Sequence, residues 1–209
     1  MKDGEYRQAI YNWRELSPHQ YEVMAELTRA AFSEYAKDNI NFRGLDVTGE
    51  ILRERMAETD QAAFALEDNG VIIAFCCGYL KGKAPAIQLR REGVQVHPGY
   101  RRRGLGGKVI QLMEQWAAEN GAQFSELTTS LKATPAIKFH KANGYVPFGY
   151  TYYDGKNYQS IVMRKYFGAP CPTHIRWRHM LKTWLQVNMV RDRNGRKRIW
   201  LRLKEKIFG

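Results

Sequence analysis

The chain has 209 residues, 44% of them hydrophobic and 26% charged, which suffices for a sizeable core in one main domain. No stretch approaches the roughly 18 consecutive apolar residues of a membrane-spanning helix, and the N-terminus has no apolar signal region, so we expect a cytoplasmic protein. The three cysteines have neither a metal-ligand spacing nor the even number of a disulfide framework, so we expect no metal site.

The formal net charge of +12 is unevenly distributed along the chain. Residues 170–209 contain 11 Lys and Arg against 2 Asp and Glu, whereas residues 1–169 contain 22 against 19. Pro170 and Pro172 lie at this change, and prolines so close together predict a stiff, non-helical joint. We therefore predict a main domain over residues 1–169 and a basic C-terminal extension over residues 170–209.

The first part of the main domain mixes helical and extended patterns. Ser17 and Pro18 form a helix start, and the apolar residues that follow recur every three or four positions. A strong hairpin signal lies at residues 68–70. We predict, in chain order, a strand over residues 6–14, a helix from Pro18 to about Lys37, a helix from Thr48, a strand over residues 62–66 and a strand over residues 71–80.

A basic, glycine-rich turn joins a strand that ends at Val96 to a helix that ends near Gly121. A helix start offers amides without intrahelical acceptors, and glycine lets an anion approach the backbone. The spacing fits neither a dinucleotide-binding Gly-x-Gly-x-x-Gly motif nor a P-loop. We predict a diphosphate site here, with a plain helix start and solvated arginines as the alternative. The residues are Arg101, Arg102, Arg103, Gly104, Leu105, Gly106 and Gly107.

Further along, residues 124–129 have an extended pattern, and residues 133–143 form a short helix that ends before Gly144. This helix and the residues after it read Ala136-Ile137-Lys138-Phe139-His140-Lys141-Ala142-Asn143-Gly144-Tyr145. Together with the Arg-x-x-Gly-x-Gly turn, it resembles the two successive signatures of the GNAT superfamily of N-acyltransferases. Residues 161–165 resemble the closing strand of that fold. The resemblance covers about residues 5–167 and not the basic extension.

This resemblance implies an α/β fold with a mixed, bent sheet, flanking helices and a V-shaped splay between the fourth and fifth strands. Where strands separate, their free backbone groups need partners, and an extended pantetheine arm can bind like an added strand. The resemblance also implies acetyl-CoA as co-substrate. Gln95 and Val96 would contact the pantetheine and acyl carbonyl, with the Val96 amide as candidate oxyanion donor, and the turn at residues 101–107 would hold the pyrophosphate.

Acyl transfer from a thioester requires a neutral amine, a polarised carbonyl and a proton for the departing thiolate. His140 occupies the place where many family members carry a tyrosine, and a histidine with a pKa near 6.5 could protonate a thiolate. A purely structural histidine is the alternative. Glu92 alternates with Val94 and Val96, so it could share their face of the strand and act as general base. A solvated carboxylate, or one paired with a neighbouring arginine, is the alternative.

In the basic extension, residues 174–190 have the spacing of an amphipathic helix, and residues 191–198 form a basic turn with a hairpin signal. We expect the extension to pack on the main domain through its tryptophans, with its basic face outward. Binding of nucleic acid or of an anionic membrane surface is the alternative. The tryptophans are Trp177, Trp184 and Trp200.

The sequence therefore predicts an N-acetyltransferase that moves an acyl group, taken as acetyl, directly from acyl-CoA to an amine. The acceptor stays open among a small amine, a protein amine and the amino group of a charged RNA, as do acyl chain length and oligomeric state. Tyr150, Tyr152 and Tyr153 could line the acceptor pocket or pack as ordinary strand residues. The alternative function is a non-catalytic module that binds CoA, or nucleic acid through the extension.

Overall fold

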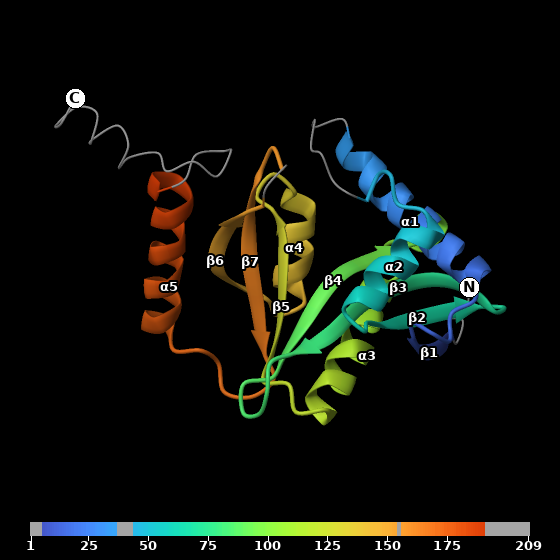
Figure 1. The fold of residues 1–209 in the computed structure, drawn as a ribbon, viewed down its shortest axis with the longest axis horizontal. Helices are drawn as coiled ribbons and strands as arrows, with labels where there is room; N and C mark the ends of the chain where they lie inside the picture. Colours follow the sequence, from blue (N-terminus) through green and yellow to red (C-terminus); the bar gives the residue numbers. More distant parts are fainter. Residues whose placement is uncertain (1–5, 37–43, 154–155, 191–209) are drawn as a thin grey trace. The chain divides into compact units, whose positions relative to one another are not determined.

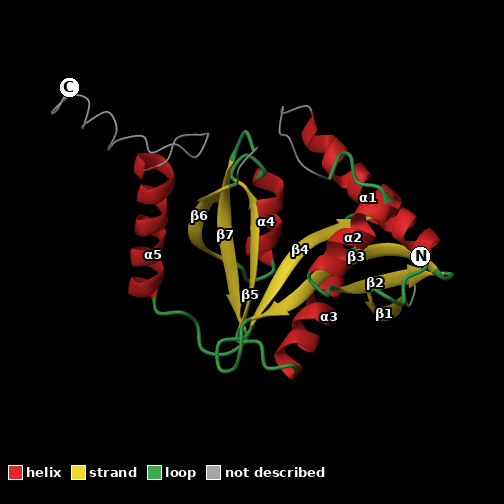
Figure 2. Cartoon of the chain, in the orientation of Figure 1, coloured by secondary structure: helices red, strands yellow, loops and turns green. Residues whose placement is uncertain are grey.

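The computed structural model describes residues 6–36, 44–153 and 156–190, and the chain divides into two units, Met1–Ser125 and Glu126–Gly209. Helices and strands follow one another as a mixed α/β fold (Figure 1, Figure 2). The α-helices among the described residues are α1 (Pro18–Ala36), α2 (Gly49–Glu58), α3 (Leu105–Glu119), α4 (Thr134–Ala142) and α5 (Thr173–Leu185). The described part of the chain contains no helix with the length and apolar character needed to cross a membrane.

The strands are β1 (Arg7–Asn12), β2 (Ala62–Asp68), β3 (Val71–Lys81), β4 (Gln88–Val96), β5 (Phe124–Ser130), β6 (Val146–Tyr152) and β7 (Gln159–Tyr166). All but β6 lie where the sequence predicts strands, within a few residues of the predicted bounds. In the first unit, β1 to β4 are successive antiparallel neighbours. In the second unit, β7 lies between β5 and β6 and pairs with β6 in antiparallel fashion.

Helices cover both faces of the sheet in the first unit, because strand β3 is apolar on both sides. Successive side chains of a strand point to opposite faces. Cys76 lies 3.4 Å from the Val109 carbonyl oxygen of α3, whereas the sulfur of Cys77 lies 3.8 Å from that of Met56 in α2. The buried core of the first unit therefore consists of two layers, one on each side of the strands.

Local capping explains where the first two helices begin. Ser17 Oγ accepts the Gln20 N–H at 3.3 Å, and Gln20 Oε1 accepts the Ser17 N–H at 2.9 Å, which is a reciprocal capping box. Thr48 Oγ1 accepts the Ile51 N–H at the start of α2 in the same way. The predicted starts of both helices are confirmed.

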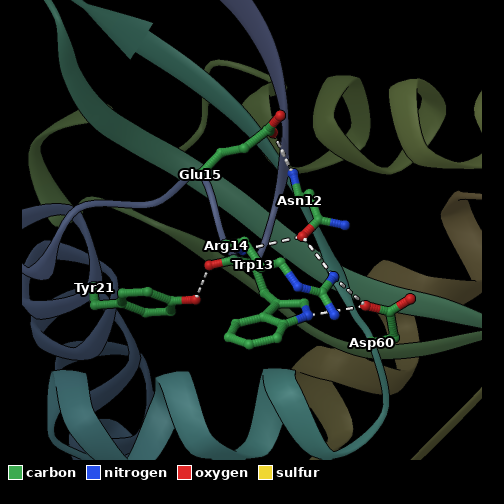
Figure 3. Close-up of polar contacts among 6 residues, drawn as sticks. All are labelled: Asn12, Trp13, Arg14, Glu15, Tyr21 and Asp60. Atoms are coloured by element: carbon green, nitrogen blue, oxygen red, sulfur yellow. Dashed lines mark hydrogen bonds and ion pairs between the residues drawn. The ribbon is translucent and has the colours of Figure 1, made fainter.

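A polar cluster ties the end of β1 to the loop after α2 (Figure 3). The indole N–H of Trp13 and the guanidinium of Arg14 both donate to Asp60 Oδ1, at 2.9 and 3.0 Å. The Tyr21 hydroxyl donates to the Trp13 carbonyl oxygen at 2.5 Å. These bonds to the Asp60 carboxylate, that of Trp13 above all, lower the pKa of Asp60.

We expect Asp60→Asn to lower the melting temperature slightly at neutral pH, because the lowered pKa means that the folded state favours the ionised carboxylate. The stabilisation of the folded state by the ionised carboxylate is present above the unfolded-state pKa of Asp60, and it is lost as the pH falls through the lower folded-state pKa. The difference in melting temperature between the variant and the wild type should therefore narrow in acid. Asp46→Asn, at another exposed aspartate, is the control. A difference in melting temperature that does not change with pH would contradict a lowered pKa of Asp60 in the folded state.

In the second unit, helix α5 packs against the edge strand β6 through polar and aromatic side chains. The Tyr150 N–H donates to Thr183 Oγ1 at 3.0 Å, and the His179 and Phe148 rings lie 4.4 Å apart. A Cβ atom on Gly149 would lie 3.1 Å from Thr183 Oγ1, so glycine is needed for this close approach. Helix α5 thus covers backbone groups that an edge strand would otherwise expose.

The expectation that the extension docks through its tryptophans is wrong for Trp177 and Trp184. These side chains are 63% and 45% exposed, because α5 turns its other side, with His179 and Thr183, toward β6. Trp200 and the residues 191–209 lie outside the described residues. The division into domains at residue 170 stays a prediction.

Candidate functional site

Strand β4 contains a β-bulge at Glu92 and Gly93. The pairing with β3 is regular up to Arg91 and resumes at Val94, so both bulge residues lie opposite Cys77. Such bulges are common next to active sites, where they redirect a side chain. An isolated glycine within a strand pattern is the sequence signal that could have indicated the bulge.

The bulge changes the face on which Glu92 lies. Residues paired across neighbouring strands share a face, so Glu92 lies on the side of Cys77, toward α2, while Val94 lies on the side of Cys76, toward α3. The expectation that Glu92 shares a face with Val94 and Val96 is therefore wrong, because simple alternation assumes a regular strand. Burial, Cys76 and the Glu92 carboxylate together raise the pKa of the Cys77 thiol.

The side chain of Gln95 lies over the backbone of Gly93. A Cβ atom on Gly93 would lie only 2.6 Å from Gln95 Nε2, so a larger residue there would displace the carboxamide. Gln95 is 5% exposed, and its Oε1 atom has no hydrogen-bond partner among the described residues. Buried polar atoms are normally satisfied, so this oxygen suits a donor from a ligand.

The turn between β4 and α3 has two residues in the left-handed region, Arg102 with φ 62° and Gly104 with φ 75°. Amides in such a turn can converge on an anion. The Gly107 N–H donates to the Gly104 carbonyl oxygen at 3.0 Å, and regular helical bonding begins there. The amides of Leu105 and Gly106 precede that first bond, so they are the ones a helix start offers to a ligand.

The space beside Gly104 is open. A Cβ atom placed on Gly104 would have no other atom within 4 Å, and the side chain of Arg102 is exposed. A phosphate group can therefore reach the backbone of this turn, and Arg102 can add positive charge beside it. The residues present fit a diphosphate.

The other two arginines of the turn are held against its backbone. Arg101 Nε donates to the Val96 carbonyl oxygen at 3.4 Å, and the Arg103 guanidinium donates to the Gly99 carbonyl oxygen at 3.3 Å. The Arg103 guanidinium also lies 5.1 Å from the centre of the Tyr100 ring. These contacts keep the positive charge of both arginines close to the turn.

Tyr100 anchors the turn to the hairpin between β2 and β3. Its hydroxyl donates to Asp68 Oδ2 at 2.7 Å, and this bond raises the pKa of Tyr100. The His97 N–H donates to the Ile73 carbonyl oxygen at 2.8 Å and fixes the end of β4. The sequence indicates Asp68 only as a turn residue, and no local signal places it beside Tyr100.

His140 lies in the last turn of α4, within the second unit. It is 6% exposed and lies edge-on to Phe139 and Tyr145, with ring centres 5.3 and 5.9 Å apart. Its backbone carbonyl accepts the N–H groups of Asn143 and Tyr145, which close the helix. His140 is therefore an interior side chain and not a surface group, and its role as an acid stays a prediction.

The side chains of two of the three tyrosines at residues 150–153 have partners of their own. The Tyr152 hydroxyl donates to the Lys156 carbonyl oxygen, and the Tyr153 hydroxyl lies 3.3 Å from Thr128 Oγ1. Their place in an acceptor pocket stays a prediction. Among the described residues, no three His, Cys, Asp or Glu side chains are grouped as metal ligands would be.

Comparison with known proteins identifies the family. The model of the acetyltransferase (GNAT) family matches residues 10–145. A 37-residue segment, 18% of this chain, is 43% identical to the "Probable N-acetyltransferase HLS1" of Arabidopsis thaliana, and the match spans only 9% of that protein.

Two solved structures show the same fold. The PaiA N-acetyltransferase of Thermoplasma acidophilum, in complex with coenzyme A, is 17% identical over 77% of this chain and 99% of its own, with a TM-score of 0.57. The yncA protein of Salmonella typhimurium, with its cofactor acetyl-CoA, is 15% identical over 79% of this chain and 97% of its own, with a TM-score of 0.56. The predicted α/β class is confirmed, and the chain belongs to the GNAT family of acetyltransferases.

Proposed function

We propose that the protein is an N-acetyltransferase that transfers the acetyl group of acetyl-CoA directly to an amine. The observation that carries this proposal is the turn between β4 and α3, where left-handed Arg102 and Gly104 precede the free amides of a long helix. In a GNAT-family chain, such a turn is suited to the diphosphate of CoA.

The turn holds the diphosphate through backbone amides, and its arginines supply charge. Leu105 and Gly106 donate their N–H groups, and Gly104 leaves room for the phosphate oxygens. Arg102 is exposed and pairs with a phosphate, whereas Arg101 and Arg103 remain against the turn. Hydrogen bonds from backbone amides to an ionised phosphate are stronger than those between neutral groups.

The end of β4 orients the acyl arm of the donor. The buried Gln95 oxygen accepts an N–H from the pantetheine amides, which satisfies an atom that has no partner among the described residues. The Val96 amide donates to the thioester carbonyl oxygen and stabilises the negative charge that develops there.

Two side chains move the protons of the reaction. The amine nitrogen forms a bond with the carbonyl carbon, the carbon–sulfur bond breaks, and the thiolate leaves. Glu92 takes the proton that the nitrogen loses, and its exposure lets an acceptor approach it from solvent. His140 gives a proton to the sulfur. Charge and protons balance, with CoA thiol and an amide as products.

Direct transfer is favoured because the two cysteines in β3 are poor nucleophiles. Burial raises the pKa of Cys76 to about 12, and it raises the pKa of Cys77 as well. A thiol is nucleophilic only as the thiolate, so neither side chain is prepared to carry an acetyl group at neutral pH. The free thiols also fit the reducing cytoplasm, where we place the protein.

We expect Glu92→Gln to lower kcat about tenfold, less than most general bases contribute, because water can replace an exposed carboxylate. CoA affinity should not change. Glu54→Gln, which removes the same charge from an exposed position on α2, is the control and should keep full activity. Equal kcat for both variants, with acetyl transfer limiting the rate, would exclude Glu92 as the base.

The function is tested by thiol release from acetyl-CoA in the presence of amines of different classes. The panel contains a polyamine, an aminoglycoside, a peptide with a free N-terminus and an aminoacyl-RNA. The proposal predicts thiol release that requires both the protein and one class of amine. A protein that binds CoA but releases no thiol with any amine of the panel would favour a binding module instead.

A further inference from the structure

Helix α5 presents an apolar face that the second unit leaves uncovered. Four large side chains recur three or four residues apart, and they are 63%, 59%, 45% and 37% exposed. So large an apolar face on a surface helix indicates an interaction site. We call these residues the α5 stripe; they are Trp177, Leu181, Trp184 and Leu185.

The stripe lies on the side of α5 opposite to its docking face. His179 and Thr183 hold the helix on β6. Trp177 and Leu181 are each two residues from His179, and two residues correspond to about half a turn of an α-helix. The stripe therefore contributes nothing to the attachment of α5, and its substitution should leave the fold intact.

Basic side chains flank the stripe. Arg176, Arg178 and Lys182 are the charged residues of α5, and no acidic residue occurs between Pro170 and Val190. The whole extension, residues 170–209, contains 11 Lys and Arg against 2 Asp and Glu. Tryptophan and leucine on one face, with lysine and arginine beside them, are typical of helices that lie in the interface of an anionic membrane.

Other occupants fit these observations less well. A second copy would bring two basic helices together without an acidic partner on either α5, so charge repulsion would oppose the pairing. An RNA would pair with the arginines and stack on the tryptophans, but it would leave Leu181 and Leu185 unexplained. An anionic lipid surface accounts for both the apolar and the basic side chains.

We propose that α5 docks the protein on an anionic membrane surface, with the α5 stripe at the boundary between headgroups and acyl chains. The helix has 13 residues, so it is about 20 Å long and lies in the plane of the surface. Arg178 and Lys182 reach phosphate and carboxylate groups of the lipids. The proposed contact is made by α5, which belongs to the second unit.

The test is a sedimentation assay of the full chain with vesicles of phosphatidylcholine alone or with about one third phosphatidylserine. We expect binding to the anionic vesicles, with a blue shift of tryptophan fluorescence. The variant Trp177→Ser with Trp184→Ser should reduce this binding at least about tenfold, because it removes two large apolar side chains from the interface. Arg178→Gln with Lys182→Gln should reduce it about tenfold and weaken its salt dependence.

Matched variants control for the loss of apolar area and of charge. Val71→Ser with Ile10→Ser removes two exposed apolar side chains from the first unit, and Arg53→Gln with Arg55→Gln removes two charges from α2. Both should bind vesicles as the wild type does. Equal binding to neutral and anionic vesicles, or unchanged binding by the tryptophan variant, would overturn the proposal. The proposal would also be overturned if vesicles bound no protein and the tryptophan variant instead disrupted a dimer or an RNA complex of the wild type.

Discussion

Gly104→Val should weaken CoA binding about 100-fold, because the valine side chain occupies the space where the diphosphate must lie. A Cβ at this position meets no protein atom within 4 Å, so the substituent points into open space beside the turn. Loss of two amide-to-phosphate hydrogen bonds at about 1.5 kcal/mol each amounts to about 3 kcal/mol, which is about 100-fold in Kd. Calorimetric titration with CoA measures the effect.

The matched control is Gly70→Val in the hairpin between β2 and β3. Gly70 has φ 79°, close to the 75° of Gly104, and a Cβ there also meets nothing within 4 Å. Both variants carry the same left-handed strain, about 1–2 kcal/mol, so both should lose similar stability. Only Gly104→Val should lose CoA affinity. A folded Gly104→Val protein that binds CoA as Gly70→Val does would exclude the turn as the diphosphate site.

Replacement of His140 by phenylalanine should lower kcat about 100-fold, because the proton donor for the departing thiolate is lost. Phenylalanine fills the space between Phe139 and Tyr145 but cannot donate a proton. His140→Tyr offers a hydroxyl at the same position and should stay within about tenfold of the wild type, as a proton donor of the type many family members carry. CoA affinity should be the same in both variants.

This pair of variants separates proton transfer from packing. Both keep an aromatic ring at a buried position, so their melting temperatures serve as a check that the packing is comparable. Steady-state turnover and a single-turnover measurement with acetyl-CoA show whether the chemical step limits the rate. If the tyrosine and phenylalanine variants turn over equally under those conditions, His140 is structural.

Local signals in the sequence predicted much of the first unit. The helix start at Ser17, the hairpin turn at residues 68–70 and the turn before α3 all depend on residues close together in the chain. Each reflects a requirement of the backbone that only a few residue types meet. The end of the short helix before Gly144, which has φ 87°, was readable for the same reason, whereas the signature around His140 was identified by its resemblance to the GNAT family.

The remaining features depend on partners far apart in the chain. The bulge at Glu92 exists only in the pairing of β4 with β3, so simple alternation placed that carboxylate on the wrong face. Asp68 and Tyr100 are 32 residues apart and meet only in the folded unit. Helix α5 docks on β6 through His179 and Thr183, because the Thr183 hydroxyl accepts the backbone N–H of Tyr150. This docking leaves the two tryptophans of α5 exposed.

The most direct measurement follows an isotope-labelled acetyl group from acetyl-CoA by mass spectrometry of both the protein and the amine that supports thiol release. Direct transfer predicts that the label appears in the amine, with one thiol released for each amide formed, and that Cys76, Cys77 and Cys171 stay unlabelled at every time point. A labelled cysteine that forms and decays before the amide appears would contradict the account. So would thiol release that leaves the label in free acetate.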